Sequence, residues 1–398
     1  MCAYIMLAVL VTVCLFVRSV EVLDMSNATV SQLIKSAGYP VEKYRVVTSD
    51  KYILQVHRIP AGRRVARKSG ATPKGKKAVL LVHGLMGSSS DFLIMGPNKS
   101  LAYILADAGY DVWLGSLRGT LNTGHVYRDR TDPKFWDYSF HEHGTYDLPA
   151  IIDNVLNITN LPRLILVGYS MGGTSSFVMF SEKPEYNDKI IAFVGLAPAV
   201  YLANHKAIVK YYVEDLKITK IMQYQATYIS SIWRQLTSWI ASNFCYVKSP
   251  QENLCFRISS RLMGEDQEQT VMEIMALLIS RLQPASWKQF EHYGKVSLTD
   301  VFTSWQDGLD GAIRPYNLSN VRVPVTLIYG LNDQLVEKSQ IQRLAKELDA
   351  NGVLEEIRPS CAWHKFNHVD FVTAKELGEM VNKPLVGIIN KLFNKYDT

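Results

Sequence analysis

Four apolar runs without alternating polar residues constrain the fold of this chain more than any other feature. They read AVLLV from residue 78, LILVGY from residue 164, IIAFVGLAPAV from residue 190 and VPVTLIYGLND from residue 323. Strands of this kind are buried on both faces, which is typical of a parallel sheet covered by helices. A further strand, YDVWLGS, and segments with helical spacing at 100–109 and 146–159 lie between these runs. This β–α–β–α order predicts a doubly wound α/β domain with a mostly parallel central sheet and helices on both faces.

Two regions do not follow this alternation of strands and helices. Residues 43–60 contain two strand-like stretches around a turn at 48–51, which predicts a hairpin. Residues 201–320 contain no comparable strand, and their stretches YISSIWRQLTSWIASNF and TVMEIMALLISRLQ have helical spacing. We therefore predict an α/β core from 20–200 and 321–398, with 201–320 inserted as a helical cap and lid. The Met, Trp and Ile side chains of the insertion either line a lipid cavity or form the insertion's own core.

The amino-terminal segment is uncharged from residue 1 to residue 17 and densely apolar from Ile5 onward. That length fits a signal-peptide core and is short for a membrane span, so we predict a signal peptide at 1–19. The usual basic flank is missing, and an uncleaved anchor is the alternative. Secretory entry implies a secreted or lysosomal protein.

Secretory entry also predicts glycosylation and oxidised cysteines. The sequence contains acceptor sequons at Asn27, Asn98, Asn157 and Asn317. Cys245 and Cys255 are near enough along the chain to close a short disulfide loop. Cys361 would then be a free thiol. A buried spectator is the commoner role for such a residue, and a catalytic thiol is the alternative.

The net charge of +6 is concentrated in one stretch. Eight basic residues and no acidic residue lie between Arg58 and Lys77, so the rest of the chain carries a small negative balance. This distribution argues against a nucleic-acid partner. The basic stretch is rich in Pro and Gly and is interpreted as a solvated loop, with contact to an anionic lipid surface as the alternative.

Ser170 stands between two glycines in GYSMG, after the run LILVGY and before the helix-like stretch MGGTSSFVMFS. A Gly-x-Ser-x-Gly pattern between a strand and a helix is typical of a nucleophile elbow, a strained turn that needs small neighbours. The turn lifts the hydroxyl clear of the backbone, and the first N–H groups of the helix face the developing oxyanion. We predict that Ser170 is a catalytic nucleophile.

A serine nucleophile needs a base, and the base needs a carboxylate that fixes its tautomer. In this fold the residues follow one another in the order Ser, acid, His. Asp333 follows the strand VTLIYG, and the histidine after it is His364 or His368, both in CAWHKFNHVDF. We choose His368, and His364 stays open on pattern alone. The oxyanion donors are expected to be the N–H groups of Met171, after the nucleophile, and Leu85, in HGLMG.

His141 and His143, in HEH, would share one face of a strand and could hold a metal. No third ligand at a sensible spacing accompanies them, so we predict a structural role, no metal and no cofactor.

The chain resembles the acid lipases, a family that includes gastric lipase, lysosomal acid lipase and their insect relatives. The resemblance rests on HGLMGSSSDF, SLAYILADAGYDVWLGSLRGT, FWDYSFHEHGTYDLPAIID, LILVGYSMGGTSSFVM, GLAPAV, PYNLSNVRVPVTLIYGLNDQL and FNHVDF. These stretches extend from about Tyr39 to Phe371. The resemblance implies the α/β-hydrolase fold and hydrolysis of neutral lipid esters.

The resemblance also implies roles for single residues. Ser170, Asp333 and His368 match the family's triad, and His368 is preferred over His364 because the family's histidine occupies the FNH position. Leu85 and Met171 match its oxyanion donors, 201–320 matches its cap and lid, and Cys245–Cys255 matches its cap disulfide with one residue more between the cysteines. The chain departs from the commoner His–Ser–Gln pattern with Tyr169 and Met171 around the serine.

The resulting hypothesis is a lipase that hydrolyses triacylglycerols or sterol esters through an acyl-enzyme at an oil–water or membrane interface. It requires no cofactor, nucleic acid or obligate protein partner. A general carboxylesterase, an amidase or thioesterase, and a non-catalytic lipid-binding member of the same fold are the alternatives.

Overall fold

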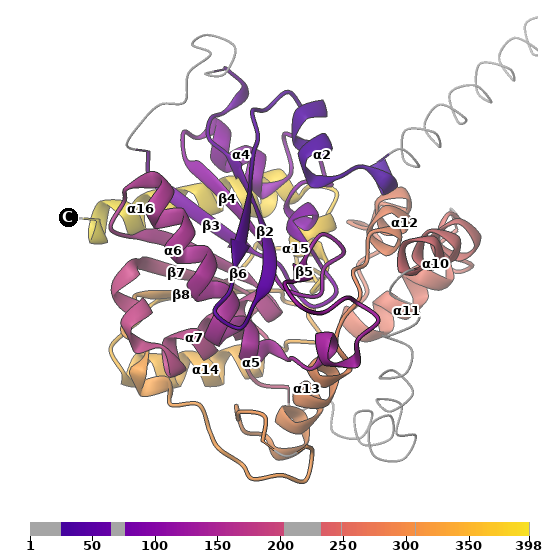
Figure 1. Cartoon of the computed structure of the whole chain (residues 1–398). Helices are drawn as coiled ribbons and strands as arrows, with labels where there is room; N and C mark the ends of the chain where they lie inside the picture. The colour runs from indigo at the N-terminus through magenta and orange to yellow at the C-terminus, as the bar shows by residue number, and fades with distance from the viewer. Residues whose placement is uncertain (1–24, 65–75, 203–231, 248, 307, 398) are drawn as a thin grey trace, which may run out of the picture.

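A computed structural model describes residues 25–64, 76–202, 232–247, 249–306 and 308–397. The described chain is built around a nine-stranded sheet with the order β1-β2-β4-β3-β6-β7-β8-β9, and β5 pairs with β2 (Figure 1). The strands are β1 (Glu42–Val47), β2 (Tyr52–Ile59), β3 (Ala78–Val82), β4 (Asp111–Ser116), β5 (Gly124–His125), β6 (Leu164–Tyr169), β7 (Ile190–Leu196), β8 (Val325–Tyr329) and β9 (Leu354–Pro359). β1, β2 and β4 pair antiparallel, and every pair from β4 to β9 is parallel.

This sheet confirms the predicted fold class. Every residue of β3, β6, β7 and β8 is buried, as expected for the apolar runs. The predicted hairpin is the β1–β2 pair, which turns at residues 48–51. β9 was not predicted, because its sequence LEEIRP is charged and all six residues are only half-buried at the edge of the sheet.

The longer core helices cover both faces of the sheet. α4 (Leu101–Asp107) and α16 (Lys383–Tyr396) contact each other on one face, while α6 (Leu148–Thr159) and α7 (Met171–Glu182) contact each other on the other (Figure 1). α14 (Lys338–Ala350) packs against β8 and β9. Because parallel strands joined through a helix are connected right-handedly, the reversal of direction after β4 places α4 opposite α6 and α7.

The remaining core helices are short. They are α2 (Val30–Ser36), η1 (Ser89–Phe92), η2 (Pro133–Trp136), α5 (Phe140–Glu142), η3 (His143–Asp147), η4 (Pro184–Lys189), η8 (Leu318–Asn320), α15 (Asp370–Thr373) and η9 (Gly378–Asn382). Among the described residues, none of the helices combines the length and the apolar character that crossing a bilayer requires.

The described residues between β7 and β8 are mainly helical. The elements, besides η8, are α10 (Trp233–Ile240), η7 (Ala241–Cys245), α11 (Leu254–Met263), α12 (Met272–Ser280) and α13 (Trp287–Thr299). α10, α11 and α12 lie at the right of Figure 1, and α13 lies below them. They include a small cluster of their own around Cys245, Cys255 and Met275. The signal-peptide prediction at 1–19, residues 65–75 of the basic stretch and residues 203–231 of the insertion lie outside the described residues.

Trp239 of α10 and Phe244 of η7 differ from the sequence expectation of a core or a cavity lining, whereas Trp233 is half-buried. Trp239 is 56% exposed and Phe244 is 38% exposed, while Thr237 is the buried residue of α10. The helical spacing predicted the helix correctly, but it does not say whether the apolar face is covered.

A buried ion-pair network joins the hairpin turn to the interior. The Arg118 guanidinium donates to Asp147 through Nε at 2.8 Å and to Asp50 through two nitrogens at 2.7 and 3.1 Å. The backbone N–H of Arg118 also donates to Asp147 at 2.9 Å. Since Arg118 and Asp147 are both buried, loss of either partner leaves a desolvated charge.

We predict that Asp147→Ala lowers the free energy of unfolding by about 3–5 kcal/mol, because Arg118 would stay buried without its main counter-ion. Urea denaturation measures the change. Asp188→Ala is the control, because its pair with Arg322 is exposed and should be worth less than about 1 kcal/mol. Equal losses in the two variants would contradict the importance of this network.

Candidate active site

Ser170 occupies a strained corner between β6 and α7. Its backbone has φ 51° and ψ −116°, a conformation that L-residues rarely adopt. A Cβ at Gly172 would lie 2.4 Å from the carbonyl oxygen of Val82, and a Cβ at Gly168 would lie 2.8 Å from Gly172. Larger residues at these two positions would therefore collide with backbone, so the glycines of GYSMG are needed for the turn.

The structure brings Ser170, His368 and Asp333 together at the carboxyl ends of β6 and β8. The Nε2 atom of His368 lies 2.9 Å from Ser170 Oγ, and its Nδ1 atom lies 2.7 Å from Asp333 Oδ2. All three side chains are buried, whereas His364 is exposed. With Nδ1–H donating to the carboxylate, Nε2 is able to accept the proton of the serine hydroxyl.

The Asp333 carboxylate is itself held in place. Its Oδ1 atom accepts the backbone N–H groups of Leu335 at 3.0 Å and Val336 at 2.7 Å. These bonds fix the carboxylate and leave Oδ2 directed at His368.

Leu85 and Met171 lie on the two backbone segments that approach Ser170. Met171 is the first residue of α7, and the first N–H groups of a helix have no partner inside it. A Cβ at Gly84, next to Leu85, would lie only 3.1 Å from Ser170 Cβ, so this loop passes directly beside Ser170. Neither the Leu85 nor the Met171 N–H donates to a backbone carbonyl of the described chain.

His83 fixes the loop that contains Leu85. Its Nε2 atom accepts the N–H of Leu117 at 3.1 Å, so Nδ1 carries the proton and donates to the carbonyl of Gly84 at 2.9 Å. Burial lowers the pKa of His83 to about 4, which keeps the ring neutral in this arrangement.

Tyr169 makes contacts that the sequence did not predict. Its hydroxyl donates to the backbone carbonyl of His368 at 3.0 Å, and its ring lies 5.3 Å from the His368 ring. The same ring lies against Gly84. Tyr169 therefore packs between the segment of Leu85 and the segment of His368, and its identity alone gave no sign of this role.

The insertion contacts α7, the helix that follows Ser170, through α13. The amide of Gln289 donates to the thioether sulfur of Met171 at 3.2 Å, and the Tyr293 hydroxyl donates to Thr174 at 3.0 Å. Both positions flank the elbow, so the side chain after Ser170 is held by a helix from a distant part of the sequence.

His141 and His143 are not on a strand, which corrects the sequence expectation. They lie in α5 and η3, where Ser139 and Glu142 form a capping box, and residues two apart on a helix point in different directions. His141 Nδ1 lies 2.8 Å from the Tyr316 hydroxyl, while burial holds the pKa of His143 well below its usual value. Within the described ranges, no group of three or more His, Cys, Asp or Glu side chains is arranged to hold a metal ion.

Cys245 and Cys255 form the predicted disulfide. Cys361 is a free thiol, as expected, and it is half-buried rather than buried. The bond joins η7 to α11 within the small cluster of the insertion.

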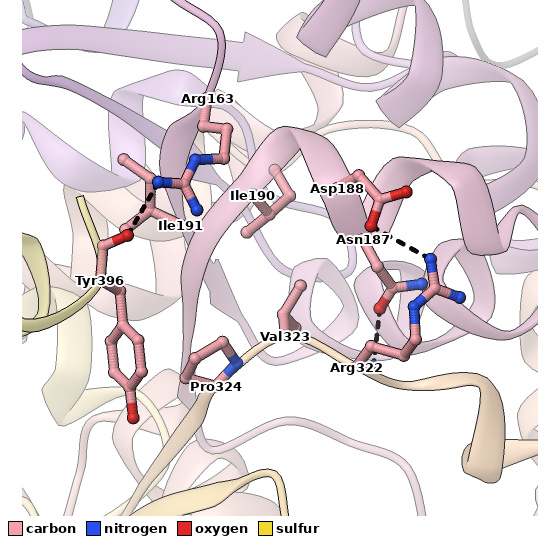
Figure 2. Close-up of a pocket in the computed structure, with 9 residues that line it drawn as sticks. All are labelled: Arg163, Asn187, Asp188, Ile190, Ile191, Arg322, Val323, Pro324 and Tyr396. Atoms are coloured by element: carbon pink, nitrogen blue, oxygen red, sulfur yellow. Dashed lines mark hydrogen bonds and ion pairs between the residues drawn. The ribbon is translucent and has the colours of Figure 1, made fainter. Parts of the chain in front are cut away.

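Two cavities lie away from the triad. One, of about 270 Å³, is at the amino-terminal edge of β7 and β8, where the Arg163 and Arg322 guanidiniums are already bonded to Tyr396 and Asp188 (Figure 2). The other, of about 670 Å³, lies beside α11 and includes Gln334, the neighbour of Asp333. Neither is lined by Ser170 or His368, and the geometry of the triad is the stronger guide to the chemistry.

The chain matches known families over most of its length. The model of the alpha/beta hydrolase fold matches residues 77–369, and the model of a partial alpha/beta-hydrolase lipase region matches residues 30–96. Lipase 1 of Drosophila melanogaster is 34% identical over 377 residues, which are 92% of this chain and 81% of the relative. Lipase 3 of the same organism is 36% identical over 87% of this chain and 89% of its own length. Gastric triacylglycerol lipase of Bos taurus is 32% identical over 92% of this chain and 91% of its own length.

Solved structures share the fold at low sequence identity. A carboxylesterase of Nitrososphaera gargenis has a TM-score of 0.52 at 14% identity, covering 88% of this chain and 100% of its own. A bacterial membrane phospholipase A has a TM-score of 0.51 at 15% identity, covering 98% and 97%. From the family models and the lipase relatives together, the chain belongs to the alpha/beta hydrolase fold family and, within it, to the lipases, which makes it a hydrolase of ester bonds.

Proposed function

We propose that the chain hydrolyses neutral lipid esters with Ser170 as nucleophile, His368 as base and then acid, and Asp333 as the carboxylate that orients His368. The observation that carries the proposal is the pair of hydrogen bonds that join Asp333 to His368 and His368 to Ser170. All three side chains are buried, which supports the proposal because water does not compete for the hydrogen bonds between them.

The reaction follows from these positions. Ser170 Oγ attacks the acyl carbonyl carbon while His368 Nε2 takes the hydroxyl proton, and Asp333 supports the imidazolium charge. The tetrahedral oxyanion accepts hydrogen bonds from the N–H groups of Leu85 and Met171, each worth roughly 3 kcal/mol of barrier. His368 then gives the proton to the leaving alkoxide, and the ester C–O bond breaks. Water, activated by His368, releases the fatty acid from the acyl-enzyme.

Triacylglycerols and sterol esters are the proposed substrates, presented at an oil–water or membrane interface. The name of the Bos taurus relative, gastric triacylglycerol lipase, supports this class. So do the large apolar side chains that α10, η7 and α11 leave exposed, since such patches mark surfaces that meet another apolar phase. They are Ile232, Trp239, Phe244, Leu254, Ile258 and Leu262. We assign residues 201–320 as the cap and lid that carry this surface.

Entry into the secretory pathway is part of the proposal. The disulfide Cys245–Cys255 fits an oxidising compartment, and the side chains of Asn27, Asn98, Asn157 and Asn317 are exposed and therefore accessible to glycosylation. We propose that residues 1–19 are a signal peptide and that the mature protein is secreted or lysosomal.

Ser170→Ala should lower kcat/KM for ester hydrolysis by about 10³-fold or more and abolish covalent labelling by a fluorophosphonate probe, because Ser170 supplies the hydroxyl bonded to the His368 imidazole among the described residues. Mass spectrometry of the labelled protein locates the modified residue. Ser181→Ala, a buried serine at the far end of α7, is the matched control and should keep both properties. Unchanged turnover in Ser170→Ala would refute the assignment, and a wild-type chain that is never labelled would favour a non-catalytic lipid-binding protein.

Substrate profiling tests the lipid class. With emulsified triolein, an emulsified sterol ester, a soluble short-chain ester, a thioester and an amide, we expect the highest rate on one of the emulsions. A preference for the soluble ester would indicate a general carboxylesterase, and a preference for the thioester or amide would overturn the lipid assignment. Saturation of the rate only above the solubility limit of the ester would support action at an interface.

A further inference from the structure

The segment 263–269, which leads from α11 of the insertion toward α12, lies directly against the loops that carry Asp333 and His368. The carbonyl oxygen of Met263 accepts the N–H of Gln334 at 3.2 Å and the N–H of His368 itself at 3.4 Å. One carbonyl of the insertion therefore holds the backbone of His368 and of Gln334, the residue after Asp333.

Side-chain hydrogen bonds also join the segment to the two loops. Asn332 donates to the carbonyl of Glu265 at 2.9 Å, and Asn367 donates to the carbonyl of Gly264 at 2.8 Å. Asn332 and Asn367 immediately precede Asp333 and His368 in sequence. A Cβ at Gly264, whose φ is 104°, would lie 2.0 Å from the carbonyl oxygen of Asn332, so the two backbones touch at this point.

Farther along, the segment is bonded to the residues that follow the histidine. The carbonyl of Gln269 accepts the N–H of Lys375 at 2.8 Å, and its side-chain oxygen accepts the N–H of Glu376 at 3.0 Å. The segment thus spans the histidine loop from its beginning to its end.

A pair of carboxyl groups lies between the segment and that loop. Asp266 accepts the indole N–H of Trp363 at 2.6 Å and the N–H of Gln269 at 3.2 Å. Asp370 accepts the N–H of Asn367 at 2.7 Å through Oδ2, while its Oδ1 atom is buried and has no N–H donor among the described groups.

The hydrogen bonding at this pair requires a proton. Each carboxyl group acts on the pKa of the other as a hydrogen-bonding neighbour, and two carboxylates have no hydrogen to share. A proton on Asp370 Oδ1, donated to the Asp266 carboxylate, satisfies the buried atom and completes the bonds of both groups.

We propose that segment 263–269 is a positioning element for the Asp333 and His368 loops, fastened by a proton that Asp370 shares with Asp266. The inference rests on the proposed function, because it concerns the alignment of that same triad. Neither carboxyl group touches Ser170, so both act through His368.

The charges around the pair favour the shared proton. Burial, followed by the neighbouring carboxylates of Asp266 and Asp333, raises the pKa of Asp370 to about 8, and burial also raises the pKa of Asp266. The other ionisable groups that interact electrostatically with the pair are Glu268, Lys365, Cys361 and Tyr169. Glu268 and Lys365 are bonded to each other at 2.8 Å, so they largely cancel.

Loss of the proton has a defined consequence. Two adjacent buried carboxylates repel, the bond between the segment and the loop is lost, and the carbonyl of Met263 no longer fixes the backbone of His368. Hydrolysis should therefore decline as the pH rises past the ionisation of Asp370, while substrate binding changes little.

Asp370→Asn provides the test, because its amide oxygen can still accept from Asn367 and its NH₂ group can donate to Asp266 without titrating. With a soluble short-chain ester, wild-type kcat should fall about 10-fold between about pH 7 and about pH 9.5, and kcat of Asp370→Asn should fall less than about 2-fold. Glu376→Gln removes an exposed carboxylate from the same loop and should retain the wild-type profile.

Unfolding supplies a readout that does not depend on catalysis. The wild-type free energy of unfolding should fall as the pH rises from about 4 to about 8, because the unfolded Asp370 ionises in this range while the folded one keeps its proton. Asp370→Asn should lose this component of the slope, and Asp266→Asn, which loses an acceptor of Trp363, should be less stable than Asp370→Asn.

The outcomes separate the two proposals. If kcat of Asp370→Asn falls at high pH as much as kcat of the wild type, the positioning proposal is overturned. Covalent labelling of Ser170 would still identify it as the nucleophile. A chain that is neither labelled nor inactivated by Ser170→Ala would refute the proposed function, and the unfolding slope would still decide whether the carboxyl pair shares a proton.

Discussion

The strained corner at Ser170 is the constraint on which the rest of the site depends. The serine can adopt a φ of 51° only because Gly168 and Gly172 let the strand, the turn and the helix approach within distances that a Cβ would not allow. Because β6, β7 and β8 are parallel, the carboxyl ends of β6 and β8 lie at the same edge of the sheet. A residue far along the chain can therefore meet the hydroxyl without any distortion of the sheet.

The sequence predicted those elements that are determined by residues close together in the chain. The buried strands follow from their uninterrupted apolar residues, and the elbow follows from glycines that nothing larger can replace. Asp333 could be named because it follows a buried strand. The choice between His364 and His368 could not be made from pattern, because both lie in one loop and only the tertiary structure separates an exposed ring from a buried one.

The contacts that sequence could not predict are those between distant segments. Tyr169 bonds to the carbonyl of His368, and Asp266 lies beside Asp370, although neither pair has any spacing signal. The error at His141 and His143 had a different origin: two histidines separated by one residue fit a strand pattern, but the Ser139–Glu142 capping box starts a helix there. β9 was missed because an edge strand needs little apolar sequence.

The insertion between β7 and β8 holds the candidate active site as much as the sheet does. Its helix α13 holds the side chain of Met171, next to Ser170, and its segment 263–269 holds the backbone of His368. Because these contacts reach both the neighbour of Ser170 and His368, the placement of the insertion contributes to the alignment of the proposed triad. An interface that draws the exposed face of α10 and α11 toward lipid would therefore act on the site through hydrogen bonds already in place, and movement of the insertion and alignment of the triad would be thermodynamically linked.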